Sequence, residues 1–167
     1  MKIFNSLKLT AATLAVLTLG LASTPASATT NVTTTFGVSA TVQSTCLISA
    51  TALAFGTYTG VVDNATSTVS VTCTNTTPYN VSLNPGTATG ATVTTRKMGG
   101  PSGALLNYAL FSNSGMTTNW GQTIGTDTVT GTGNGSSQAI TVYGQIAASQ
   151  YVTPGSYADT ITATVTY

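Results

Sequence analysis

Apolar and polar residues alternate along most of this chain, in short runs separated by turn-forming residues. Side chains of a β-strand point alternately to the two faces of its sheet, so a period of two predicts strands. Such runs occur at residues 32–42, 69–73, 79–83, 106–110, 140–146 and 161–167. No stretch after residue 28 shows the period of an amphipathic helix. Short strands at near-regular spacing are typical of a β-sandwich or barrel, so the sequence predicts one all-β domain.

Turn-forming residues lie between the predicted strands. Asn84-Pro85-Gly86 and the glycine-rich residues 131–135 are expected turns. The glycine-rich stretch lacks the Lys-Ser/Thr that follows in a phosphate-binding loop, so a β-turn is the better interpretation. Asp63, which precedes Asn64, and Asp127 are also expected in turns.

The first 28 residues have the pattern of a secretory signal peptide. Lys2 and Lys8 give a positive start, residues 9–21 are apolar, and Ala26-Ser27-Ala28 matches the small-residue cleavage site. The apolar run is shorter than the roughly 20 residues that a transmembrane helix needs. We therefore expect export, with cleavage after Ala28 leaving 139 of the 167 residues.

The mature chain is expected to begin with an unusually long strand. Its one face carries Val32, Thr34, Phe36, Val38, Ala40 and Val42. The run is longer than the usual five or six residues of a strand. It contains neither a charged residue nor a proline, which would discourage pairing along an exposed edge. Two interpretations are open: the segment pairs within its own sheet, or it is donated to another chain.

Cys46 and Cys73 are the two cysteines of the chain. An even pair in an exported protein predicts a disulfide. Metal ligation and redox chemistry are disfavoured, because the chain has no histidine and no C-x-x-C spacing. In the predicted strand at residues 69–73, Cys73 shares a face with the apolar residues, so the disulfide should point into the core.

Charge is scarce and excludes several classes of function. After cleavage, the positive side chains are Arg96 and Lys97, and the negative ones are Asp63, Asp127 and Asp159. The chain has no histidine and no glutamate. Such a chain has no electrostatic surface for nucleic acid or for an anionic membrane. Its surface is hydrated by Thr, Ser, Asn and Gly in place of charged residues. Such a weakly charged surface suits a protein that packs permanently against others.

Catalysis is not expected either. General acid and base chemistry needs tuned His, Glu, Asp or Lys side chains, and here the three aspartates are widely spaced in sequence. We therefore predict no enzyme activity, no cofactor, no metal and no small-molecule substrate. The single tryptophan, Trp120, is interpreted as a packing residue rather than a binding hot spot.

An ordered set of residues across positions 29–167 resembles the spore coat protein U-type domain family, which includes the major pilins of archaic chaperone–usher pili. The set comprises Cys46, Leu53-x-Phe55-Gly56-x-Tyr58, Val71-x-Cys73, Pro78-Tyr79, Arg96-x-Met98, Leu106-x-Tyr108-x-Leu110, Trp120-Gly121, Gly131-Thr132-Gly133, Val142-Tyr143-Gly144-x-Ile146 and Gly155-x-Tyr157-x-Asp159.

The resemblance implies an incomplete immunoglobulin-like β-sandwich, completed by a donated strand. It implies a donor segment at residues 29–44 and a pilin β-sandwich at residues 45–167. It also implies that a periplasmic chaperone pairs with the last strand, through Ile161, Ala163, Val165 and Tyr167. The expected partners are identical or related pilin subunits, the chaperone and an outer-membrane usher. The expected location is the cell surface, reached through the periplasm.

The expected function is that of a structural pilus subunit, polymerising by donor-strand exchange for adhesion and biofilm formation. Two alternatives stay open at this point. One is a secreted monomeric β-sandwich that acts as a binding module, with its N-terminal strand in its own sheet. The other is a non-pilus spore-coat or matrix protein.

Overall fold

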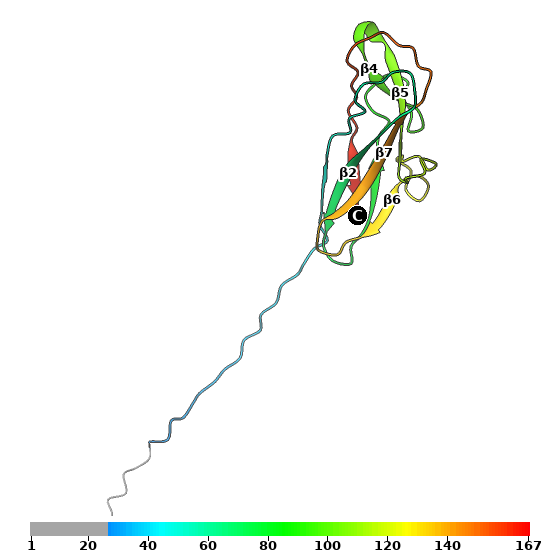
Figure 1. Ribbon diagram of the computed structural model, residues 1–167. Helices are drawn as coiled ribbons and strands as arrows, with labels where there is room; N and C mark the ends of the chain where they lie inside the picture. The colour runs from blue at the N-terminus through cyan, green and yellow to red at the C-terminus, as the bar shows by residue number, and fades with distance from the viewer. Residues whose placement is uncertain (1–26) are drawn as a thin grey trace, which may run out of the picture. The chain divides into compact units, whose positions relative to one another are not determined.

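The computed structural model describes residues 27–167 (Figure 1). Residues 1–26, which hold all but the last two residues of the predicted signal peptide, lie outside the described residues. The chain divides after Ala40, and the two parts are described separately. Within residues 27–167, no helix is long and apolar enough to cross a membrane.

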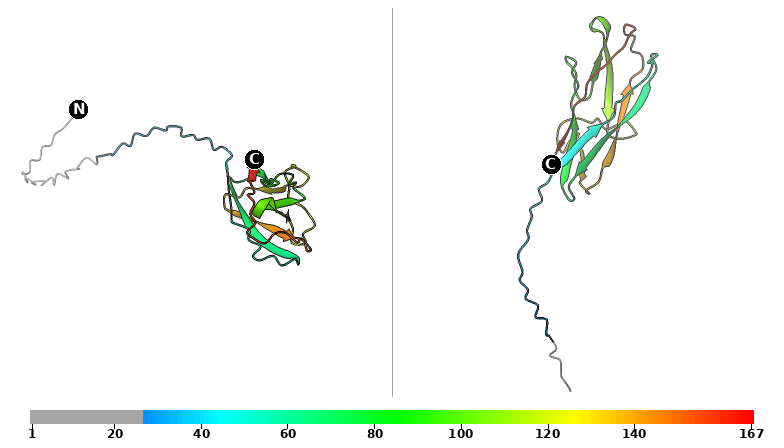
Figure 2. Two further views of the ribbon diagram at one scale, coloured as in Figure 1. Left: turned by 90° about the horizontal axis from the view of Figure 1, so that it is seen from above. Right: turned by 90° about the vertical axis from the view of Figure 1, so that its left-hand side faces the viewer.

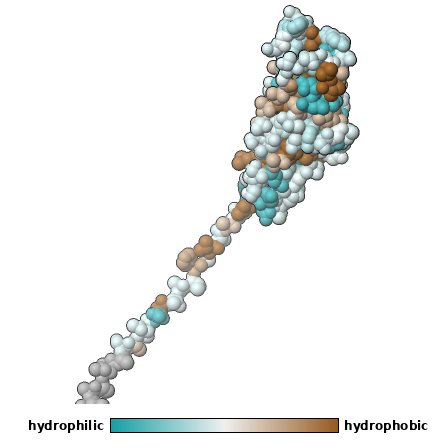
Figure 3. Space-filling view, viewed as in Figure 1, coloured by the Kyte–Doolittle hydropathy of each residue, from teal (hydrophilic) through white to brown (hydrophobic). Residues whose placement is uncertain are grey.

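Residues 27–40 carry no regular secondary structure, and all of their side chains are exposed. Figure 3 shows apolar side chains standing at intervals along this extended segment. Val32 is 96% exposed and Phe36 is 86% exposed. The strand predicted at residues 32–42 is not formed in the single chain.

Residues 41–167 form a sandwich of two antiparallel sheets (Figures 1 and 2). The larger sheet has the order β1 (Cys46–Ala50), β2 (Asp63–Cys73), β7 (Gln138–Ile146), β5 (Leu105–Phe111), β4 (Arg96–Gly99). The smaller sheet has the order β6 (Val129–Thr132), β3 (Pro78–Leu83), β8 (Ala163–Thr166). A short 3-10 turn, η1 (Pro101–Gly103), joins β4 to β5. The prediction of an all-β domain is confirmed.

The alternating residues of the predicted strands form the core between the sheets. Its buried members include Val69, Val71, Cys73, Tyr79, Val81, Leu83, Leu106, Tyr108, Leu110, Val142 and Ile146. Trp120 is fully buried among them, and its indole Nε1 donates a hydrogen bond of 2.8 Å to the Val81 carbonyl. The interpretation of Trp120 as a packing residue is confirmed.

Three local predictions need correction. Asp63 is not a turn residue but the first residue of β2, because its backbone pairs with Ile146 in β7. Gly131 belongs to β6 and pairs with Tyr79, so the glycine-rich turn starts only after Thr132. The last strand begins at Ala163 rather than at residue 161.

The predicted disulfide between Cys46 and Cys73 is present. The two residues lie directly opposite each other in β1 and β2, with Cα atoms 4.1 Å apart. Cys73 is buried in the core, so the bond fixes the beginning of the edge strand β1 to the centre of the sandwich.

Replacing Cys73 by alanine should lower the free energy of unfolding by about 2–5 kcal/mol, because the unfolded chain gains freedom when the loop is opened. Urea unfolding of the exported protein measures this loss. The double replacement of Cys46 and Cys73 by alanine is the control for effects of a free thiol, and it should lose a similar amount. Free-thiol labelling of the denatured, unreduced wild type should find none, and two labelled thiols per chain would contradict the bond.

Candidate functional site

The two sheets leave an opening on one side of the sandwich. β1 is an edge strand of the larger sheet and β8 is an edge strand of the smaller one, and the two strands approach each other. β8 pairs only with β3, so the backbone groups along its other edge have no strand partner among the described residues. An uncovered edge of this kind is a template for pairing with a further strand.

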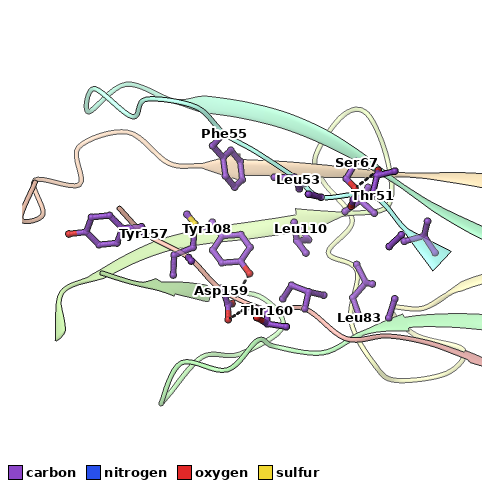
Figure 4. Close-up of a pocket in the computed structure, with 18 residues that line it drawn as sticks. Thr51, Leu53, Phe55, Ser67, Leu83, Tyr108, Leu110, Tyr157, Asp159 and Thr160 are labelled. Atoms are coloured by element: carbon purple, nitrogen blue, oxygen red, sulfur yellow. Dashed lines mark hydrogen bonds between the residues drawn. The ribbon is translucent and has the colours of Figure 1, made fainter. Parts of the chain in front are cut away.

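A groove runs along this opening, between residues 50–60 on one rim and residues 150–163 on the other. It consists of two cavities of about 410 and 960 Å³, which share Leu53, Phe55, Met98 and Tyr157 in their linings. Figure 4 shows the smaller cavity, with Phe55, Tyr108 and Tyr157 toward one end and Leu83 toward the other. The rings of Phe55 and Tyr108 meet edge to face, with centroids 6.1 Å apart.

The floor of the smaller cavity is the hydrophobic core itself. It is formed by the buried side chains of Val69, Leu83, Leu110 and Val142. In a complete sandwich such residues are covered from both sheets and from the edges. Here one flank of the core stays open to any apolar side chain that enters between the rims.

A hydrogen-bond network holds the rim of the larger cavity. The Tyr58 hydroxyl donates to the Ala147 carbonyl at 2.7 Å and accepts from the Gln150 backbone at 3.1 Å. The side chain of Gln150 in turn exchanges two hydrogen bonds with the backbone of Asn107 in β5, at 2.8 and 2.9 Å. These bonds fix the loop after β7 to β5 and to the opposite rim, which keeps this end of the groove in shape.

Asp159 is a charged residue in the lining of the groove. Its carboxylate accepts hydrogen bonds from the Tyr108 hydroxyl at 2.7 Å, from the Thr87 backbone at 2.8 Å and hydroxyl at 2.9 Å, and from the Thr160 backbone at 2.8 Å. Partial burial alone would raise the pKa of Asp159, but these bonds outweigh it and hold the pKa below its usual value. Burial and the bond to Asp159 raise the pKa of Tyr108, which stays a neutral donor.

Replacing Asp159 by asparagine should lower the free energy of unfolding near neutral pH by about 1 kcal/mol, since solvent screens this half-exposed group. A lowered pKa means that the carboxylate stabilises the fold fully above its ordinary pKa of about 3.9, and that this contribution is lost as the pH falls through the native value. Urea midpoints of both proteins should therefore converge in acid. Asp63→Asn is the control, and a gap that stays constant down to about pH 2 would contradict the role of the charge.

Arg96 is completely buried and donates four hydrogen bonds to backbone carbonyls. They go to Asn84 at 2.9 Å, Val93 at 2.7 Å, Leu83 at 3.1 Å and Trp120 at 2.7 Å. Burial lowers the pKa of Arg96, opposed by the neighbouring Tyr108, Asp159 and Asp127, and a guanidinium stays protonated in any case. The bonds join β4, which supplies Met98 to the groove, to the end of β3. The sequence motif contained Arg96, but a lone arginine gives no signal of burial.

The predicted site residues fall into two groups. In the donor segment, Val32, Phe36, Val38 and Val42 are 85–96% exposed, and Thr34 and Ala40 are also exposed. In the C-terminal segment, Ile161 and Ala163 line the groove, Val165 packs against the core, and Tyr167 is 58% exposed. Within residues 27–167 no three His, Cys, Asp or Glu side chains gather as a metal site would require.

The described architecture is a β-sandwich with an open edge and an accessible core. The Spore Coat Protein U domain model matches residues 32–164, and the chain belongs to this family. Among curated proteins no significant match was found.

Two solved structures resemble this chain. One is a chain of the CsuC–CsuE chaperone–tip adhesion subunit pre-assembly complex from the archaic chaperone–usher Csu pili of Acinetobacter baumannii. It is 27% identical with a TM-score of 0.58, and the match covers 76% of this chain but only 40% of that one. The other, the minor tip subunit HdaB of the E. coli Hda pilus, is 19% identical with a TM-score of 0.37, covering 71% of this chain and 79% of that one. The family and the first neighbour confirm the immunoglobulin-like sandwich.

Proposed function

We propose that this protein is a structural subunit of an extracellular pilus that polymerises by donor-strand exchange. Residues 1–28 are the signal peptide, residues 29–44 are the donor strand, and residues 45–167 are the domain that receives a strand. Each subunit lends its N-terminal segment to the groove of a neighbouring subunit. The fibre then serves adhesion and biofilm formation at the cell surface.

One observation carries this proposal: the core is open at a groove, while an alternating apolar segment is exposed in the same chain. The groove has a floor of buried core residues and a free strand edge on β8. Phe36 and Val38 are each 86% exposed, which isolated soluble proteins avoid for neighbouring large apolar residues on one face. A donated strand satisfies both, since it supplies main-chain partners and apolar side chains together.

The energy of this step is large enough to drive assembly. Seating Phe36, Val38, Ala40 and Val42 in a groove removes their apolar surface from water, which contributes about 5–9 kcal/mol before main-chain hydrogen bonds. This is comparable with the whole stability of a small domain. Filling the groove therefore couples the stability of each subunit to its neighbour.

Assembly partners follow from the same geometry. An open subunit needs a temporary cover before it meets the next one, and a periplasmic chaperone that pairs with residues 161–167 supplies it. An outer-membrane usher then releases the subunit to the surface. The match to a chain of a chaperone–subunit pre-assembly complex supports the chaperone as a partner.

A non-pilus surface coat is the second candidate, because the chain belongs to the Spore Coat Protein U domain family. A chaperone and usher pair encoded beside this protein would separate the pilus from the coat. A monomeric binding module is less favoured, because nothing would then cover the apolar side chains of the donor segment or the open groove.

The size of the mature protein tests donor-strand exchange against the monomeric alternative. A fibre former should give ladders of polymers in detergent without heating, which collapse to one band after prolonged heating. A single monomeric species at all concentrations would overturn the proposal.

A further inference from the structure

Side chains of the C-terminal segment, residues 157–167, alternate between the groove and solvent. Tyr157, Asp159, Ile161, Ala163 and Val165 are partly buried, whereas Thr160, Thr162, Thr164 and Thr166 are exposed. Residues directly opposite each other in paired strands share a face. The apolar face of a donated segment, residues 32–42, must therefore lie opposite the partly buried set. Alignments that satisfy this differ by steps of two residues, since a slip of one turns the apolar face to solvent.

The direction of the donated strand follows from the sheet that it would extend. β3 pairs antiparallel with both β6 and β8, so the smaller sheet is wholly antiparallel. Antiparallel pairing is slightly more stable per residue than parallel pairing, and sheets of one kind are over-represented. A strand added at the free edge of β8 is therefore expected to run antiparallel to it.

The alignment is set by the size of the side chains on the rims. Four alanines, Ala50, Ala52, Ala158 and Ala163, line the smaller cavity of about 410 Å³ above the core. Small side chains on both rims leave room for one large side chain from outside. Phe36 is the single aromatic residue of the donor segment 29–44. A large residue facing small ones is the arrangement that fills a core without voids.

We propose that the donated segment binds antiparallel to the C-terminal segment of its neighbour with Phe36 opposite Ala163. This inference rests on the proposed donor-strand exchange and specifies its register. The same alignment places Val38 opposite Ile161 and Ala40 opposite Asp159.

The two nearest alternatives fit less well at two places. A shift of two residues one way sets Phe36 against Ile161, and the opposite shift sets it against Val165. The space beside Ala163 then receives only the smaller Thr34 or Val38 side chain, which leaves it underfilled. The shifts also bring Val38 or Val42 against the Asp159 carboxylate in place of Ala40. That carboxylate is charged and half exposed, and a larger apolar neighbour would strip more water from it.

Cysteine pairs on the solvent face can measure the register without disturbing the core. Thr35 is exposed on the donor segment, and in the proposed register it lies opposite Thr164. Its partner would be Thr162 or Thr166 if the strand were shifted by two residues. Directly opposite residues have Cα atoms within disulfide range, about 4.5–5.5 Å, while diagonal neighbours lie beyond it. Full-length Thr35→Cys is therefore combined in turn with Thr162→Cys, Thr164→Cys and Thr166→Cys.

Mature polymers of the three double variants are compared after mild oxidation, boiling and electrophoresis without reductant. We expect covalent ladders that are several-fold stronger for the Thr35→Cys, Thr164→Cys variant than for the other two. The single variants are the controls and should give only monomers and dimers. A second pair, Ser39→Cys with Thr160→Cys, should also form ladders, because these positions face each other only if the strands are antiparallel in this register.

Each contrary outcome has its own meaning. Ladders strongest with Thr162→Cys or Thr166→Cys would overturn the register while leaving donor-strand exchange in place. Failure of the second pair would overturn the antiparallel direction. A cross-linked monomer would show that the segment pairs within its own chain, and absence of both covalent ladders and unheated polymers would overturn the exchange itself.

Discussion

Replacing Phe36 by aspartate is expected to abolish polymers completely. In a neighbour's groove this change would bury a carboxylate without a partner, at a cost of several kcal/mol, and remove the largest apolar contact of the segment. The domain itself should stay folded, since Phe36 is 86% exposed in the single chain. Detergent ladders of exported protein measure the result.

Thr35→Asp is the matched control for the Phe36→Asp variant. It adds the same charge one residue away, on the face that points to solvent in a donated strand, so ladders should persist. Polymers from Phe36→Asp would contradict the role of the segment. Mixing Phe36→Asp with a variant that lacks residues 29–44 should also give no fibre, because neither can donate, while either one should terminate wild-type chains.

Replacing Arg96 by methionine is expected to prevent stable folding. Four backbone carbonyls would lose their donor in a fully buried position. Each unsatisfied buried group costs about 1–3 kcal/mol, so the total approaches the whole stability of a small domain. Loss of the exported protein and of a cooperative urea transition are the measurements.

Lys97→Met is the control, because it removes the neighbouring positive charge from the same strand at a half-buried position. It should change stability by less than about 0.5–1 kcal/mol. Arg96→Lys should also be strongly destabilising, since one ammonium cannot reach four carbonyls on three segments as a guanidinium does. A normal unfolding midpoint for Arg96→Met would show that the guanidinium is dispensable.

The strands of the core were predictable because their side chains alternate. Val69, Val71 and Cys73 share one face, and burial on that face leaves a clear period of two. Asp63 was misassigned, because aspartate near asparagine is typical of turns and only the long-range pairing with β7 draws it into a strand.

The sequence indicated the apolar alternation of residues 32–42 and of residues 161–167, but not the groove. The length and uncharged face of residues 32–42 are local properties, so the sequence contains them. The groove is assembled from segments far apart in the chain, such as Leu53 and Tyr157, and no local pattern reveals that they face each other. The same holds for Arg96 and for Asp159, whose partners Thr87 and Tyr108 lie far from it in sequence.

In the proposed exchange, the stability of each subunit depends on its partner. The side chains on the rims, including Ile161 and Ala163, are only partly buried in the single chain. In the proposed exchange they would complete their packing when a strand binds, so the fibre would be more stable than its separate subunits. This dependence would also protect the cell, because a subunit without its cover is marginal and open to proteolysis.

The most direct test of donor-strand exchange is the effect of a peptide spanning residues 29–44 on a subunit that lacks them. The peptide should bind in the groove and raise the urea midpoint of the subunit strongly, while a peptide with Phe36→Asp should leave the midpoint unchanged. Equal midpoints with and without the native peptide, in a subunit that unfolds cooperatively, would contradict donor-strand exchange by this segment.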